Sequence, residues 1–439
     1  MGSRADPRRL LRQHDFRHLW AADAVSQLGT RISLLAVPLL AISTLHASTL
    51  QVSLLRTAQT VAFLLLGLPA GAWCDRMRRR PVLVAADLGR AALLGSVPLA
   101  AALGLLTLGQ LYAVVLCTGA LTVFFDVSHQ SFLPTLVTRD RLVDANATLA
   151  GNLSVAAVAG PGLAGLLVQS LTAPSALLAD AVSFLVSAGW LRSIRAVEPR
   201  PERAGRPHLR REIAEGLRFV LGHPILRPIA ANGAIVLFFQ SAQDGISVVF
   251  LVREVHLSPG VIGLLGTFGL LGAVVAALVA RRVAAVLGQA RALWLLSGVN
   301  GVGFLLFPLT DGGWRLGFYL AGGLLTSFCI VVTSIIGVTF RQAACPPHLL
   351  GRANATMRFL FSGAVPLGSV IGGVLGTVVG LRPTMWIGGA GVLAATGWLI
   401  GSPLRTMRDL PTDTVSSPSP EPASDQEPNI AGRPDTLAG

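Results

Sequence analysis

Long apolar stretches alternate with short polar segments along most of the chain. About twelve of these stretches reach the ~20 residues that an α-helix needs to cross a bilayer. Only helices satisfy their backbone hydrogen bonds in lipid as single runs, so the pattern predicts an all-α polytopic membrane protein. We place the spans at residues 19–44, 50–73, 82–104, 109–130, 146–169, 174–194, 227–252, 259–281, 292–309, 315–337, 355–379 and 383–401.

Composition agrees with a protein that lies in the lipid bilayer, since the 439 residues are 52% hydrophobic and 13% charged. The first apolar stretch continues to full spanning length without a small-residue cleavage site. This favours a retained helix over a removed signal peptide.

Arginines mark one side of the membrane. The chain has no lysine, so all 35 basic residues are arginine. Thirty fall on the side where the N-terminus begins, while Arg253, Arg315 and Arg382 fall on the other side, and Arg31 and Arg56 lie within spans. Cytoplasmic loops carry the excess of basic residues, so we expect a cell-membrane protein with both termini in the cytoplasm. The net charge of +13 then reflects topology, and no nucleic-acid partner is expected.

The longest internal polar tract divides the spans six and six. The predicted organisation is an N-terminal cytoplasmic segment, a six-helix bundle, a cytoplasmic linker, a second six-helix bundle and a disordered Pro/Ser-rich tail, at residues 1–18, 19–194, 195–226, 227–404 and 405–439. The bundles repeat one another: Ala-Asn-Ala-Thr occurs at 145–148 and 353–356, at an offset of 208 residues. An offset of six helices returns each copy to the same side, which indicates a parallel duplication rather than chance similarity.

Two cofactor motifs fail on inspection. The stretch "GPGLAG" at 160–165 fits a dinucleotide-binding fingerprint with Asp180, but it lies inside an apolar span instead of between a strand and a helix. A phosphate-binding P-loop needs a lysine, which the chain lacks. The four cysteines show no paired spacing, so neither a metal nor a cofactor is expected.

Two short motifs resemble those of the major facilitator superfamily. The turn "GAWCDRMRRR" is similar to its Gly-x-x-x-Asp-Arg-x-Gly-Arg-Arg loop between the second and third helices, with Arg78 in place of the second glycine. The "GPGLAG" stretch is similar to the signature of exporters, and with the two Ala-Asn-Ala-Thr stretches it looks most like the branch of macrolide-efflux proteins and enterobactin exporters. The matching residues are Gly71, Asp75, Arg76, Arg79 and Arg80 in the loop and Gly160, Pro161, Gly162 and Gly165 in the fifth span.

The resemblance implies two six-helix bundles and roles for both motifs. Asp75 would latch the two bundles together on the cytoplasmic side when the cavity faces outward, although the arginines beside it also fit plain membrane anchoring. The glycines at 160–165 would allow close helix packing, and Pro161 would bend the fifth helix.

Polar residues inside the predicted spans are the candidates for a substrate and proton pathway, because such groups are unfavourable in lipid and face a cavity or a partner. In the superfamily fold, the first, fourth, seventh and tenth helices line the cavity. The candidates on these helices are Asp23, Gln27, Arg31, Thr122, Asp126, Gln240, Gln243, Asp244 and Thr333. Asp23 and Asp126 also fit an interfacial position, Arg56 and Asp180 fit a mutual pair, and His129 and Asp87 fit structural roles.

Arg31 and Asp244 form the sharpest hypothesis. Arg31 needs an anion nearby, which Asp244, Asp23 or an anionic substrate would supply. Asp244 is the predicted carrier of the coupling proton.

The predicted function is a monomeric secondary transporter that exports amphipathic small molecules in exchange for protons, by alternating access and without enzymatic activity. An importer or uniporter of a small polar solute is the first alternative and would show several convergent hydrogen-bonding groups. A membrane subunit of an ATP-driven complex is the second and would need a separate ATPase.

Overall fold

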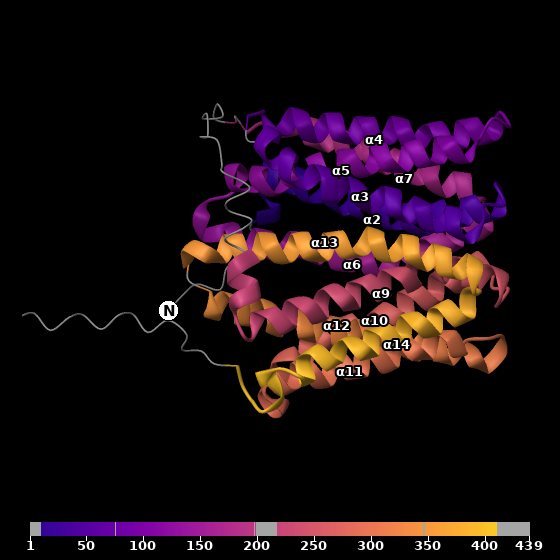
Figure 1. Ribbon diagram of the computed structural model, residues 1–439. Helices are drawn as coiled ribbons and strands as arrows, with labels where there is room; N and C mark the ends of the chain where they lie inside the picture. Colours follow the sequence, from indigo (N-terminus) through magenta and orange to yellow (C-terminus); the bar gives the residue numbers. More distant parts are fainter. Residues whose placement is uncertain (1–9, 75, 197, 199–216, 346, 411–439) are drawn as a thin grey trace, which may run out of the picture.

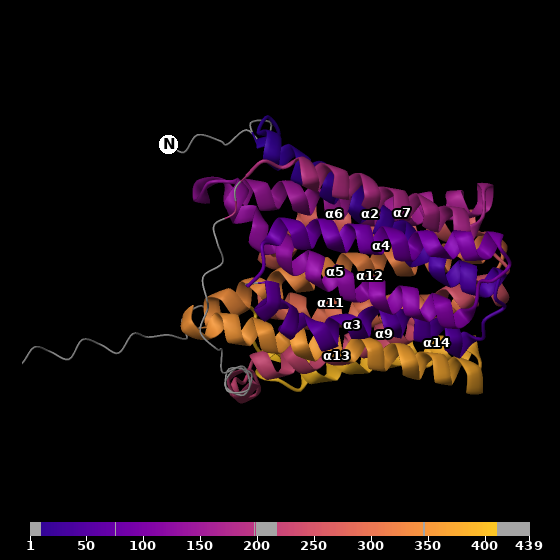
Figure 2. The same cartoon turned by 90° about the horizontal axis from the view of Figure 1, so that it is seen from above.

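The computed structural model describes residues 10–74, 76–196, 198, 217–345 and 347–410. Within these residues, twelve helices are long and apolar enough to cross a membrane. They run roughly side by side through the molecule (Figures 1 and 2). The predicted all-α membrane fold with twelve spans is confirmed.

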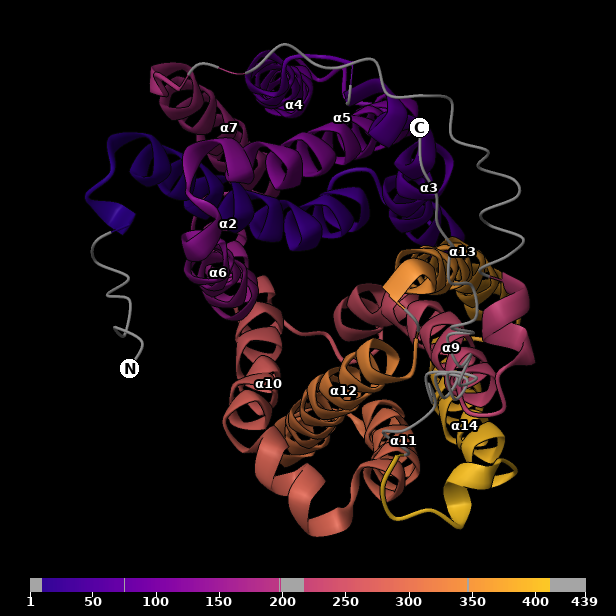
Figure 3. The ribbon, with the colours of Figure 1, turned by 90° about the vertical axis from the view of Figure 1, so that its left-hand side faces the viewer.

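The helices form two groups that Figure 3 shows end-on. The first group, here the N-half, comprises α2 (His14–Ser43), α3 (Thr49–Cys74), α4 (Arg79–Ala102), α5 (Leu108–Leu136), α6 (Leu142–Ser170) and α7 (Ala173–Ser193). The second group, here the C-half, comprises α9 (Leu226–Arg253), α10 (Pro259–Leu287), α11 (Gln289–Leu306), α12 (Leu316–Ala344), α13 (Pro347–Val378) and α14 (Leu381–Ile400).

The two ends of the molecule are distinct. Helix α2 begins and α14 ends at one end, here called the termini side, which lies on the left in Figure 1. At the opposite end, the far side, short connections join successive helices. Two of these connections have the same backbone cap: His46 (φ 48°) follows α2 and His256 (φ 58°) follows α9. In each, the next amide donates to a carbonyl six residues back, Ala47 to Ala41 and Leu257 to Leu251, both at 2.9 Å.

The buried apolar side chains form three cores. One core lies toward the far side and includes residues of both halves, such as Leu40 of α2 and Phe250 of α9. The other two lie toward the termini side, and each belongs to one half, around Phe132 and around Phe340. The halves are therefore packed together on the far side and packed separately on the termini side.

The halves meet along two seams, between α3 and α13 and between α6 and α10 (Figure 3). The α3–α13 seam is tight on the far side, where Ser53 Oγ donates to Gly245 O at 3.1 Å and Ser369 Oγ donates to Ser53 O at 3.1 Å. It loosens toward the termini side, where a Cβ added at Gly363 would come no closer than 4.0 Å to Leu64, and one at Gly71 would meet nothing within 4 Å.

Two arginines counted above among the loop charges lie inside helices. Arg90 is 2% exposed and stands eleven residues into α4, which is ~16 Å along the helix axis at 1.5 Å per residue. Arg358 stands at a similar distance into α13, with its guanidinium 4.6 Å from the ring centre of Phe63 in α3. The predicted span 82–104 contains Arg90, but the count of arginines by side places it with the loop charges. The predicted eleventh span begins at residue 355, whereas α13 begins at Pro347, so Arg358 lies deeper than expected.

Candidate functional site

An ion pair joins the two halves inside the membrane-spanning region. Arg56 of α3 donates from Nη2 to Asp244 Oδ2 of α9 at 3.1 Å. The side chains are 39% and 38% exposed and border a small cavity of about 80 Å³ with Leu34, Val37 and Ser247. Of the hydrogen bonds that the structure describes between the halves, all lie in the far half of the molecule.

This pair corrects two expectations. Asp244 pairs with Arg56, and not with Arg31. Asp180 is buried in the N-half, where it accepts hydrogen bonds from Ser33 and Ser183, so it does not pair with Arg56 either. Position along the sequence gives a residue's depth in a helix, but the neighbour at that depth depends on how the helices are rotated and arranged.

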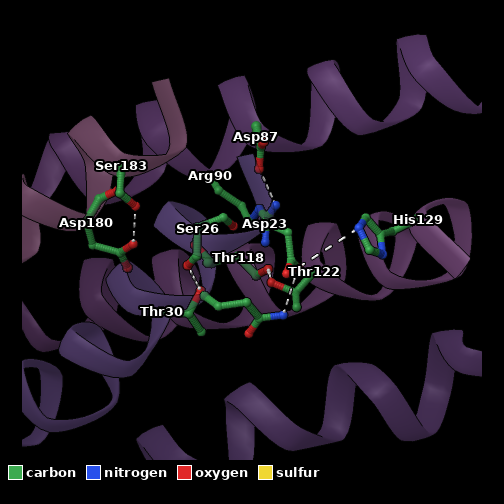
Figure 4. Close-up of polar contacts among 11 residues, drawn as sticks. Asp23, Ser26, Thr30, Asp87, Arg90, Thr118, Thr122, His129, Asp180 and Ser183 are labelled. Atoms are coloured by element: carbon green, nitrogen blue, oxygen red, sulfur yellow. Dashed lines mark hydrogen bonds and ion pairs between the residues drawn. The ribbon is translucent and has the colours of Figure 1, made fainter. Parts of the chain in front are cut away.

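Asp23 is the centre of a polar cluster within the N-half (Figure 4). The carboxylate is 5% exposed and accepts from Asn152 Nδ2 of α6 at 2.9 Å and from Gln27 Nε2 at 3.5 Å. His129 Nε2 lies 4.0 Å from Asp23 Oδ1, the oxygen that also accepts from Gln27. Asp23 is therefore buried among the helices of the N-half and does not face the space between the halves. Asn152 was not a candidate from the sequence, because a lone asparagine in a span gives no signal of its partner.

A buried ion pair lies next to this cluster. Arg90 pairs with Asp87 one turn earlier on α4 (Figure 4). Its guanidinium stacks between the rings of Phe125 at 4.3 Å and Phe184 at 4.2 Å. Both side chains are almost fully buried, at 2% and 0% exposure. The pair therefore has no access to the space between the halves and braces α4 against α5 and α7.

Asp126 and Thr122 lie on the same helix, α5. Thr122 Oγ1 donates to the Thr118 carbonyl at 2.8 Å and lines a cavity of about 110 Å³ inside the N-half. Asp126 is partly exposed, and the charges that act on it are those of Arg90, Arg358 and Asp23.

The candidates of the C-half separate into two environments. Gln243 is 2% exposed and donates to Phe304 O at 3.2 Å and Met385 O at 2.8 Å, so it ties α9 to α11 and α14. It does not line the space between the halves, contrary to the expectation. Gln240 and Thr333 are partly exposed, and Thr333 Oγ1 donates to the Cys329 carbonyl at 2.8 Å.

Arg31 has no carboxylate within ion-pair distance among the described residues. Its side chain is partly buried, and its Cβ packs against the backbone of Gly160 in α6.

Within the described residues, the hydrogen bonds of the charged turn between α3 and α4 go to the N-half and to Glu198, which lies just beyond α7 in the linker. The backbone amides of Arg79 and Arg80 both donate to Glu198 at 2.6 Å, and Arg80 Nε donates to Leu191 O at 3.1 Å. The amide of Arg76 donates to Trp73 O at 3.0 Å. Asp75, the predicted latch, lies outside the described residues.

The glycines of the fifth span lie in the α6–α10 seam. A Cβ at Gly165 would be 2.9 Å from Gly263 Cα and closer still to the Pro259 carbonyl. Gly162 N donates to Thr267 Oγ1 of α10 at 2.9 Å, and Pro161 packs on Gly266. Gly160 instead makes room for Arg31.

A larger cavity opens between α3, α5 and α13, where the α3–α13 seam loosens. It measures about 340 Å³ and combines aromatic and apolar walls with few polar groups. Its lining includes Phe63, Leu64, Val127, Asn354, Arg358 and Phe359. This mixture is typical of small-molecule sites. Among the described residues, no cluster of His, Cys, Asp or Glu has the geometry to hold a metal ion.

Comparisons with known proteins agree with this architecture. The family described as "Transmembrane secretion effector" matches residues 7–429. The multidrug efflux pump Tap of Mycolicibacterium fortuitum is 27% identical over 350 residues, which cover 74% of this chain and 81% of that protein.

Solved structures share the fold at lower identity. The nucleoside transporter NupG superposes with a TM-score of 0.73 at 9% identity, over 88% of this chain and 98% of that chain. A bacterial homologue of the iron transporter ferroportin, in an inward-facing state, superposes with a TM-score of 0.70 at 19% identity, over 89% of this chain and 98% of that chain. Because the family match spans most of the sequence, the chain belongs to the transmembrane secretion effector family of major facilitator transporters, and it is a transporter and not an enzyme.

Proposed function

We propose that the protein exports amphipathic small molecules in exchange for protons, by alternating access. The observation that carries this proposal is the Arg56–Asp244 ion pair, which joins the halves on the side that is closed. With both termini in the cytoplasm, as the arginines favour, the closed far side faces outward and the structure is inward-facing.

Asp244 is the proposed carrier that couples a proton to this closure. A guanidinium at 3.1 Å stabilises the carboxylate form while the far side is closed. When that side opens, the pair separates and the carboxyl group takes up a proton from outside. Return to the closed state brings Arg56 back and favours release of the proton toward the cytoplasm.

The substrate class rests on the cavity beside Phe63. Aromatic and aliphatic walls suit the apolar body of a ligand, and Arg358 and Asn354 offer hydrogen bonds to its polar groups. The resemblance to a multidrug efflux pump supports export over import. Arg31 adds an unpaired cation for substrates with an anionic group.

Vesicle transport tests the coupling role. Asp244→Asn should abolish export driven by a proton gradient while it spares exchange of substrate at equal concentrations, because only the driven reaction requires a proton to be carried. Asp180→Asn is the matched control, since Asp180 is also an intramembrane acid but hydrogen-bonds only within the N-half. Driven export that persists in Asp244→Asn refutes the role of Asp244, and Asp126 becomes the candidate.

A further inference from the structure

A basic groove lies on the outer surface of the N-half, where α4 begins and α7 ends on the termini side. Its volume is about 600 Å³. Its walls carry four arginines and one acid, Arg78, Arg80, Arg192, Arg195 and Glu198, together with apolar residues of α4. Helices α4 and α7 stand at the outer edge of the N-half, away from the C-half (Figure 3). The groove is therefore separate from the space between the halves.

The Glu198 carboxylate binds backbone amides and, among the described residues, forms no ion pair with an arginine side chain of the groove. Its two carboxylate oxygens accept from the backbone amides of Arg79 and Arg80, each at 2.6 Å, so the acid caps the start of α4. Arg80 in turn donates to the carbonyls of Leu191 and Arg192 at the end of α7. The anion-binding capacity of this helix start is thus already used by the protein itself.

Three guanidinium groups remain for an external anion. Arg78, Arg192 and Arg195 are exposed, and no carboxylate of the described residues lies within ion-pair distance of any of them. They stand where α4 enters and α7 leaves the membrane-spanning region, which is the depth of lipid headgroups.

An apolar strip continues from these arginines along α4. Pro81, Ala85 and Leu88 are exposed at spacings of four and three residues, so they share one face of the helix. Leu88 is 48% exposed although it lies in a spanning helix. This face points away from the bundle and into the bilayer. The arginines at one end of the groove match the anionic headgroup of a phospholipid, and the apolar strip matches its acyl chain.

We propose that this groove binds an anionic phospholipid, with its phosphate among Arg78, Arg192 and Arg195 and an acyl chain along Ala85 and Leu88. Basic pockets between helices on the cytoplasmic side suit anionic headgroups. A free phosphate ion would use the arginines but would gain nothing from the strip. The site is independent of the transport route, so its failure leaves the proposed function untouched.

The test uses the purified full-length chain in detergent, with phosphatidylglycerol or phosphatidylcholine added and the bound lipid counted by native mass spectrometry. The variant Arg192→Gln/Arg195→Gln should weaken phosphatidylglycerol binding roughly thirty-fold, about 2 kcal/mol at ~1 kcal/mol for each basic residue. The matched control is Arg281→Gln/Arg282→Gln, which removes two exposed arginines from α10 in the other half. The control should bind phosphatidylglycerol as the unmodified protein does.

Two further arms distinguish a lipid from a free anion. Glycerol 1-phosphate, which has the headgroup chemistry without the chains, should fail to displace phosphatidylglycerol at equal concentration. Leu88→Ser should weaken phosphatidylglycerol binding although all arginines are retained. This variant keeps the test valid if Arg192→Gln/Arg195→Gln folds poorly. Three outcomes would overturn the proposal. Arg192→Gln/Arg195→Gln could bind phosphatidylglycerol as well as Arg281→Gln/Arg282→Gln does, the unmodified protein could bind phosphatidylcholine as well as phosphatidylglycerol, or glycerol 1-phosphate could displace the lipid fully.

Discussion

At the scale of single residues, each described charge in the membrane-spanning region has a distinct environment. Arg56 and Asp244 are half-exposed and lie between the halves, whereas Arg90 and Asp87 are sealed within one half between two aromatic rings. An exposed pair between moving bodies is free to separate during a transport cycle. A sealed pair has fixed partners and serves as a brace. Exposure and location, more than the charge itself, therefore distinguish the coupling candidate from the structural pair.

The buried Arg90–Asp87 ion pair predicts how replacing Arg90 changes the stability of the protein. Arg90→Met should destabilise the protein by about 3–5 kcal/mol, because it leaves the Asp87 carboxylate buried without its partner. Asp87→Leu should act similarly. The double variant should regain most of this loss, since a buried ion pair is often replaceable by apolar groups of similar size. Thermal unfolding in detergent of the unmodified protein, the two single variants and the double variant measures the coupling energy between Arg90 and Asp87. Additive losses would mean that the two side chains do not act as a pair.

The sequence identified polar intramembrane residues but not their partners. Asp23, Asp126 and Asp244 were recognisable because an acid is rare in an apolar span. Asn152 as the partner of Asp23, and Arg56 as that of Asp244, depend on helix rotation and on the contact between halves. Neither is encoded locally.

At the scale of elements, the glycines of α6 divide into those that touch another helix and those that do not. Gly165 approaches the backbone of α10, and backbone atoms cannot move aside as a flexible side chain can. Gly151, nearer the termini side of the same helix, has nothing within 4 Å of an added Cβ. One helix thus follows its partner closely on the far side and diverges from it on the termini side.

Alanine substitutions should have opposite effects at these two glycines. Gly165→Ala should lower the thermal unfolding midpoint, because its methyl group would overlap Gly263 and the Pro259 carbonyl. Gly151→Ala should raise it slightly, since alanine favours a helix over glycine by about 1 kcal/mol. The comparison holds the helix and the substitution constant. A stabilising Gly165→Ala would show that the α6–α10 seam is looser than described.

Helix number and order followed from hydropathy, because spanning length is a property of each segment alone. The depth of Arg358 did not, since the start of its helix was placed at residue 355 instead of Pro347. The matching caps at His46 and His256 also escaped the sequence comparison, because only the backbone conformation reveals them. These caps agree with the duplication that the Ala-Asn-Ala-Thr pair indicated.

At the scale of the whole molecule, closure is asymmetric. Both halves share one apolar core on the far side, while each has its own core on the termini side. The duplication and the superfamily resemblance predicted two bundles, and the arginine count predicted which side is cytoplasmic. The sequence contained no information on which side is closed, because an alternating-access transporter adopts both arrangements with the same residues.

Cysteine accessibility tests orientation and closure together, in a background without the four native cysteines. For orientation, Ser193→Cys lies at the end of α7 on the termini side and Gly312→Cys lies in an exposed far-side connection. An impermeant maleimide should label Gly312→Cys in intact cells and Ser193→Cys only after lysis. The reverse pattern would invert the topology and make the structure outward-facing.

For closure, the informative pair is Ala355→Cys and Ser53→Cys. Ala355 is exposed in the cavity at the loosened α3–α13 seam, whereas Ser53 is fully buried where that seam is tight. A maleimide added to inverted vesicles should therefore label Ala355→Cys quickly and Ser53→Cys slowly. Asp244→Asn removes the charge that holds Arg56, so in that background labelling of Ser53→Cys from the outer side should accelerate several-fold as the far side opens more often. Unchanged labelling would show that the Arg56–Asp244 pair does not hold the halves together, although both residues lie between them.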